Sequence, residues 1–241
     1  AEAQAYQRVY KGAWVSMSIF ARALEGGYVN FGVFALYGDP ALNDALNVVM
    51  RVATAFPLDE LLAYPKASRA YFALLDVLCQ QHTGDVFSLD AHSFGHVVSS
   101  LQEGLQSLEV WMSSTSAVSL DHLSAFRFRQ RPREGTGGVA VRAQSEAAPE
   151  LFPRVLEVLF SVVLAEDCPN QWSLSRPLLS LILSNEEAFL AIQERTISSQ
   201  ATAEARSAVA EAFAKLMAEV QPNLESKNKD KFTQNVTIFR H

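Results

Sequence analysis

The chain has 241 residues, of which 49% are hydrophobic and 19% are charged, and its formal net charge is -6. This apolar fraction can bury a sizeable core, which excludes intrinsic disorder as a description of the whole chain. The acidic balance argues against a general nucleic-acid binder, and no stretch reaches the ~18–20 uninterrupted apolar residues of a membrane span.

Apolar residues recur with helical spacing along most of the chain. From Leu42 to Ala53 they are three and four residues apart, and the same spacing returns from Val209 to Val220. This spacing is typical of an amphipathic helix, and no convincing alternation with a period of two is present. The sequence therefore predicts an all-α protein.

Glycine, proline and capping residues divide the chain into helices. Asp39 before Pro40, and Asp90, stand where an N-cap is expected. In chain order we expect helices near 4–25, 40–53, 58–64, 66–81, 90–108, 119–129, 151–166, 173–183, 186–198, 202–220 and from 229 onward. Paired antiparallel, these helices form hairpins of ~40–45 residues, typical of tandem helical repeats. A single helical bundle is the competing architecture.

One segment differs in composition from the rest of the chain. Residues 127–142 contain five arginines and one acidic residue, together with Pro132 and three glycines. This composition predicts a flexible basic loop at 130–147. Arginines can bind phosphate or an acidic partner, and the alternative is a loop that is only solvated. The candidate contact residues are Arg127, Arg129, Arg131 and Arg133.

No pattern in the sequence amounts to an active site. His92 and His96 are four residues apart, but the glutamate of the zinc-protease motif is missing and no third ligand stands at the right spacing. Cys79 with His82 lacks an orienting group, so a core thiol is the better interpretation. We therefore expect no enzyme activity, no metal site and no cofactor.

Two connecting segments are rich in aromatic residues. Residues 28–38 contain four aromatic residues, whose rings we expect to dock into adjoining hairpins. Between two later helices, Trp172 and Arg176 fall on one helical face. They predict either a joint between hairpins, fixed by burial of the tryptophan, or a contact site for a partner protein.

These two segments also carry a resemblance to a known family. The matching stretches are Gly27–Asp39, Leu61–Lys66, Asp167–Leu179 and Lys229–Asn235. In order along nearly the whole chain, the sequence resembles the C-terminal region of an importin-β-type nuclear export receptor, or karyopherin, which binds the GTPase Ran. The region around 127–149 does not follow the family pattern.

The resemblance implies a fold and a function. The fold would be a right-handed superhelical solenoid of HEAT-type antiparallel hairpins, with residues 1–241 forming the C-terminal repeats of a larger receptor. That receptor would carry protein cargo through the nuclear pore, contact nucleoporins, and shuttle between nucleus and cytoplasm. It would bind Ran in the GTP form, mainly through regions outside this chain. The alternative is a stand-alone helical scaffold that binds acidic partner segments.

Overall fold

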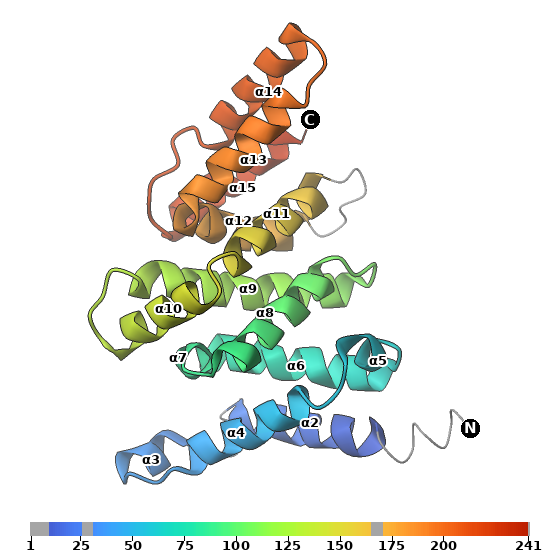
Figure 1. Cartoon of the computed structure of the whole chain (residues 1–241), viewed down its shortest axis with the longest axis vertical. Helices are drawn as coiled ribbons and strands as arrows, with labels where there is room; N and C mark the ends of the chain where they lie inside the picture. Colours follow the sequence, from blue (N-terminus) through green and yellow to red (C-terminus); the bar gives the residue numbers. More distant parts are fainter. Residues whose placement is uncertain (1–9, 26–30, 165–170, 241) are drawn as a thin grey trace. The chain divides into compact units, whose positions relative to one another are not determined.

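The computed structural model describes residues 10–25, 31–164 and 171–240, and these residues form helices without any strand (Figure 1). The all-α prediction is therefore confirmed for the described ranges. Two units emerge, residues 1–101 and 102–241. None of the described helices combines the length and apolar character that crossing a bilayer requires.

The first unit is organised around α6. Its helices are α2 (Lys11–Leu24), α3 (Phe31–Leu36), α4 (Ala41–Ala53), α5 (Leu58–Leu62), α6 (Pro65–Gln81), α7 (Thr83–Phe87) and most of α8 (Ala91–Leu105). Helix α6 packs against α2, α5 and α7. Tyr71 of α6 is fully buried, and its hydroxyl lies 2.7 Å from the Ser100 hydroxyl of α8. This bond satisfies the one polar atom of a large core side chain.

Asp90 caps α8 as the sequence predicts, whereas the N-cap residue of α4 is Pro40, and Asp39, the predicted cap, stands one residue before it. Asp39 Oδ1 accepts a hydrogen bond from the Ala41 amide at 2.8 Å. Asp90 Oδ1 accepts from the amides of His92 and Ser93, both at 3.0 Å. Each bond satisfies a backbone donor that the helix itself cannot pair.

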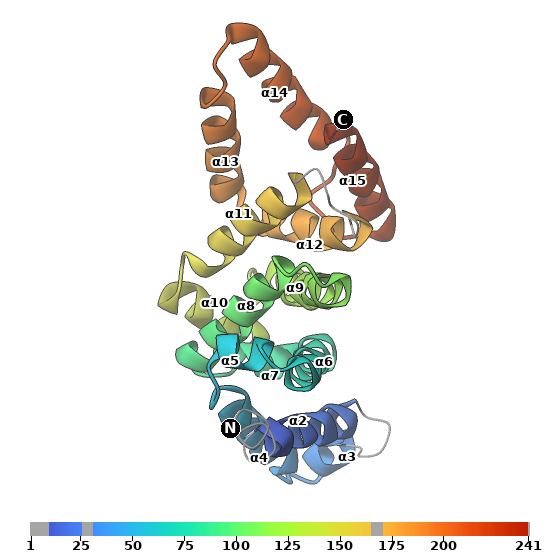
Figure 2. The ribbon, with the colours of Figure 1, turned by 90° about the vertical axis from the view of Figure 1, so that its right-hand side faces the viewer.

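The second unit is organised around α12. It contains α9 (Val110–Gln130), α10 (Thr136–Ala147), α11 (Leu151–Leu164), α12 (Gln171–Ser184), α13 (Glu186–Ser198), α14 (Ala203–Leu216) and α15 (Ser226–Phe239). Helix α12 packs along α9 and also contacts α11, α13 and α15. In Figure 2, α13, α14 and α15 follow one another on the same side of α12.

Four phenylalanines tie the last helices of this unit together. Phe160 of α11, Phe189 of α13, Phe213 of α14 and Phe239 of α15 have ring centroids between 5.0 and 6.5 Å apart. These separations are those of attractive aromatic pairs. The cluster therefore supplies a common core for helices that start far apart in the sequence.

The flexible loop predicted at 130–147 is wrong for most of its length, because α10 occupies it. The first turn of α10 lies so close to the end of α9 that a Cβ on Gly138 would be 1.8 Å from the Arg133 carbonyl oxygen. Glycine is needed here for close packing rather than for flexibility. Val141 follows one turn later on the buried face.

The sequence predicts that the aromatic rings of segment 28–38 dock into adjoining hairpins. This prediction is wrong for the part of the segment that the structure describes. Residues 26–30 lie outside the described ranges, and the following residues form the short helix α3. Leu36 and Tyr37 are 80% and 82% exposed. The described end of this segment therefore does not bury its large apolar side chains.

Candidate functional site

Arg127 is the one member of the predicted arginine group that lies in the core of its unit. It is on α9 and only 6% exposed. Its Nη1 donates to the Ser184 carbonyl oxygen and to Asn185 Oδ1, each at 3.0 Å. Its guanidinium carbon lies 4.8 Å from the centroid of the Phe152 ring, within the range of a cation–π contact. Arg127 thus joins α9 to α11 and to the junction of α12 and α13.

The charge of Arg127 is poorly compensated. Burial, together with the charge of Arg131, lowers the pKa of Arg127 to about 10, and no carboxylate opposes this shift. The side chain therefore stays protonated at neutral pH. Its Nε is buried without a hydrogen-bond partner among the described residues. A buried charged group with an unused donor is energetically unfavourable.

A cavity of about 700 Å³ opens beside this guanidinium. Arg131, the residue just after α9, also lines the cavity, and its Nη1 is 3.4 Å from the same Ser184 oxygen. The remaining wall comes from α10, the start of α11, the end of α12 and the start of α13. It is made by Ser145, Pro149, Glu150, Pro153, Leu183, Ser184, Asn185, Glu186, Glu187 and Ala188.

The other arginines of the group do not reach this cavity. Arg129 and Arg133 are exposed. Arg142 of α10 donates through Nη1 to the carbonyl oxygens of Arg131 and Arg133, at 3.3 and 2.8 Å. Arg142 therefore satisfies carbonyl groups at the C-terminal end of α9. The structure brings together only Arg127 and Arg131.

Trp172 and Arg176 are exposed on α12, and Trp172 retains 59% of its accessible surface. The interpretation of a joint fixed by burial of the tryptophan is therefore wrong, while the role of both residues as a contact site stays a prediction.

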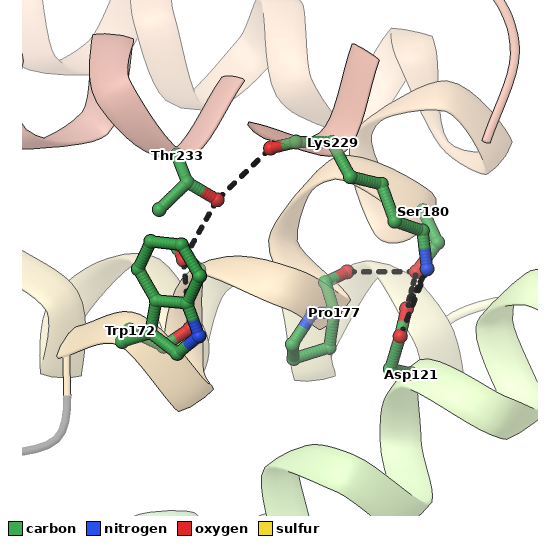
Figure 3. A network of polar contacts seen from close by, with 7 residues as sticks. Asp121, Trp172, Pro177, Ser180, Lys229 and Thr233 are labelled. Atoms are coloured by element: carbon green, nitrogen blue, oxygen red, sulfur yellow. Dashed lines mark hydrogen bonds and ion pairs between the residues drawn. The ribbon is translucent and has the colours of Figure 1, made fainter. Parts of the chain in front are cut away.

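Partly buried polar contacts link α12 to its neighbours α9 and α15. Figure 3 shows Lys229 of α15 reaching Asp121 of α9, beside Ser180 of α12. Lys229 Nζ is 3.0 Å from Asp121 Oδ2, and the two side chains are 24% and 15% exposed. The Ser175 hydroxyl of α12 lies 3.3 Å from that of Thr233 on α15.

Cys79 of the first unit is fully buried, and the ring nitrogens of His82 contact other groups. Burial raises the pKa of the Cys79 thiol far above its usual range. His82 Nε2 lies 2.9 Å from the Leu24 carbonyl oxygen, and its Nδ1 lies 3.6 Å from Asp85 Oδ2. The interaction with Asp85 raises the pKa of His82. Burial lowers the pKa of His96. In the described part of the chain no three His, Cys, Asp or Glu side chains gather at metal-binding distance.

Sequence reasoning missed the burial of Arg127, although a signal for it exists. Ser116, Leu120, Leu123 and Arg127 are buried and lie three or four residues apart on α9. Extending this stripe through Arg127 would have placed it on the core face. The partners at Ser184 and Asn185 are more than fifty residues away, and no local pattern announces them.

Three relatives illustrate the similarity of this chain to known proteins. Exportin-7-B of Xenopus laevis is 39% identical over 98% of this chain and 22% of its own length. Ran-binding protein 17 of Homo sapiens is 35% identical over 98% of this chain and 23% of its own length. Exportin-7 of Dictyostelium discoideum is 35% identical with the same coverage.

No family model matches the chain. The chain spans less than a quarter of the length of these relatives, and the segment that it matches is their C-terminal region. The resemblance noted in the sequence is thereby confirmed: over nearly its whole length, this chain is similar to the C-terminal region of exportin-7 proteins.

Proposed function

We propose that this chain forms C-terminal helical repeats of a nuclear export receptor of the importin-β type. The observation that carries the proposal is 39% identity to Exportin-7-B over 98% of the chain. The fold is compatible with it, because the long helices α2 and α6 pack together in one unit and α9 and α12 pack together in the other. In such a receptor these helices would be HEAT-type hairpins of a right-handed solenoid.

In this proposal the complete receptor binds Ran in its GTP form and carries protein cargo. The names of the relatives, exportin and Ran-binding protein, support these two partners. Ran would contact mainly repeats outside this chain. The receptor would pass through the pore in contact with nucleoporins and would shuttle between nucleus and cytoplasm.

The part played by this chain would be to extend the receptor surface. Binding on helical repeats is spread over many contacts along stacked helices. Exposed side chains in the second unit suit such contacts, among them Arg129, Arg133, Trp172 and Arg176. Trp172 and Arg176 combine an aromatic surface with a positive charge, a pair of residue types enriched where proteins meet.

A chimera tests the export role. The matched segment of Xenopus laevis Exportin-7-B is replaced by these 241 residues, and the purified chimera is offered to immobilised Ran loaded with GTP or GDP. We expect the chimera to bind Ran loaded with GTP but not Ran loaded with GDP. In permeabilised cells we expect the labelled chimera to pass through nuclear pores. A chimera that is folded by circular dichroism but neither binds Ran-GTP nor enters nuclei would contradict the proposal.

The isolated 241-residue chain is the second arm of the same experiment. We expect it to show little binding to Ran in either nucleotide state, because the main Ran contacts would lie elsewhere in the receptor. Tight binding that depends on GTP, by this chain alone, would overturn that division of roles.

A further inference from the structure

We propose that the cavity beside Arg127 binds a carboxylate side chain of a partner protein, from a segment in which basic residues flank the acidic one. Arg127 and Arg131 would be the anchoring residues. This inference concerns the 241 residues themselves and does not depend on an export role.

The first argument is the unused hydrogen-bonding capacity of Arg127. A guanidinium carries five N–H donors, and the two bonds of Arg127 leave from Nη1 only. The Nη2 has no hydrogen-bond partner among the described residues and, unlike the fully buried Nε, it remains accessible, and no acidic group acts on the pKa of Arg127. Arg127 is 6% exposed and therefore 94% buried. A buried arginine is stabilised most by a carboxylate, because a carboxylate accepts charge-assisted hydrogen bonds from the fork of guanidinium donors.

The second argument is the start of α13, which faces the same cavity. No side chain caps this helix. The residue in the N-cap position, Asn185, uses its amide elsewhere: Oδ1 accepts from Arg127, and Nδ2 donates to the Leu181 carbonyl oxygen at 2.8 Å. The first backbone N–H groups of α13 are therefore left for another acceptor. The positive end of the helix dipole adds to the attraction for an anion.

The third argument concerns which anion fits. Three exposed glutamates, Glu150, Glu186 and Glu187, also line the cavity. Their charges repel any anion, and they repel a doubly charged phosphate about twice as strongly as a singly charged carboxylate. The same charges attract lysine or arginine side chains on either side of a bound carboxylate. A volume of about 700 Å³ is large enough for a few side chains of a peptide.

Peptide binding to the 241-residue chain tests this inference. The probe is fluorescein-labelled Gly-Lys-Glu-Lys-Gly, with an amidated C-terminus so that the glutamate supplies the only carboxylate of the peptide itself. The label is attached through an uncharged spacer. The first comparison peptide carries Gln in place of Glu, and the second carries phosphoserine. We expect fluorescence anisotropy to show at least about tenfold tighter binding of the Glu peptide than of either comparison peptide. Equal binding of the Glu and Gln peptides, or tighter binding of the phosphopeptide, would overturn the proposal.

Variants locate the binding site. Arg131 is exposed, so Arg131→Gln should leave the fold intact and weaken the Glu peptide about tenfold. The matched controls are Arg129→Gln and Arg133→Gln, which remove the same charge outside the cavity and should change binding less than twofold. If all three variants weaken binding equally, general electrostatic attraction explains it and the cavity is not the site.

A charge reversal at the rim provides an independent readout. Glu187→Lys should weaken the peptide flanked by lysines and improve the ratio of phosphopeptide to Glu-peptide affinity. An unchanged ratio would sink the argument that rim glutamates select the ligand. Loss of Ran-GTP binding by a chimera would leave these peptide results untouched, so the two proposals fail separately.

Discussion

Replacing Gly138 by alanine should destabilise the second unit. The added Cβ would stand 1.8 Å from the Arg133 carbonyl oxygen and 2.9 Å from that of Gln130, whereas real Cβ contacts essentially never fall below 3.0 Å. The first turn of α10 would have to move by about 1 Å or more. Overpacking of this kind costs ~1–3 kcal/mol. Alanine in a helix gains ~1 kcal/mol over glycine, which offsets only part of the cost.

Urea denaturation followed by far-ultraviolet circular dichroism measures this effect. Because the clash is with backbone atoms, the cost should lie at the upper end of the range for overpacking, ~3 kcal/mol. After subtraction of the ~1 kcal/mol gained by alanine, we expect Gly138→Ala to lower the free energy of unfolding by about 2 kcal/mol. Gly95→Ala is the matched control, because Gly95 lies inside α8 with nothing within 4 Å of a new Cβ. It should stabilise by up to ~1 kcal/mol. A Gly138→Ala protein as stable as the parent would refute the close packing of α10 on the end of α9.

Three further measurements address other contacts. Lys229→Met should lower the free energy of unfolding by roughly 1–3 kcal/mol, because it leaves the largely buried carboxylate of Asp121 without its cation. Lys231→Met removes an exposed ion pair and should lower the free energy of unfolding by less than ~1 kcal/mol. Urea titrations of both variants compare the two effects. Proton NMR titration should place the pKa of His82 above, and that of His96 below, the ordinary value of about 6.5. The contribution of His82 to stability is then full below pH ~6.5 and disappears as the pH rises through the folded-state pKa of His82. The contribution of His96 disappears as the pH falls through the folded-state pKa of His96. Titration of both histidines at the same pH would contradict both assignments. In a Cys168→Ser background, Cys79 should react with a thiol reagent only as fast as the protein unfolds, and rapid reaction of the native protein would contradict its burial.

The sequence predicts the fold best where one local signal acts alone. The helix expected at 186–198 coincides with α13, and Asp90 caps α8 through its own carboxylate. The carboxylate of Asp39 accepts a hydrogen bond from the first amide of α4, although Pro40 is the N-cap residue. In each case the deciding interaction lies within a few residues of the signal. The family resemblance succeeds for a related reason, because it compares long segments and needs no knowledge of contacts.

The failures share one physical cause, which is packing between distant parts of the chain. The glycines of α10 suggest flexibility from the sequence alone, but the structure packs Gly138 closely against the backbone of Arg133. Arg127 reads as a solvated charge until Ser184 and Asn185, from another helix, accept its hydrogen bonds. Trp172 reads as buried because of its size, yet α12 is held by the smaller Ser175 and Ser180 and leaves the indole exposed. Composition describes a residue type, whereas these outcomes depend on the neighbours it meets.

The phenylalanine cluster has a consequence for the order in which the second unit matures during synthesis. Phe160 and Phe239 share a core although 79 residues separate them along the chain. A ribosome adds ~5–20 residues per second, so α11, α13 and α14 wait for several seconds with aromatic faces uncovered until α15 emerges. During that interval the nascent chain presents apolar surface that the mature unit conceals. Within this unit α15 therefore acts as the closing element, because its Phe239 covers rings that the earlier helices expose.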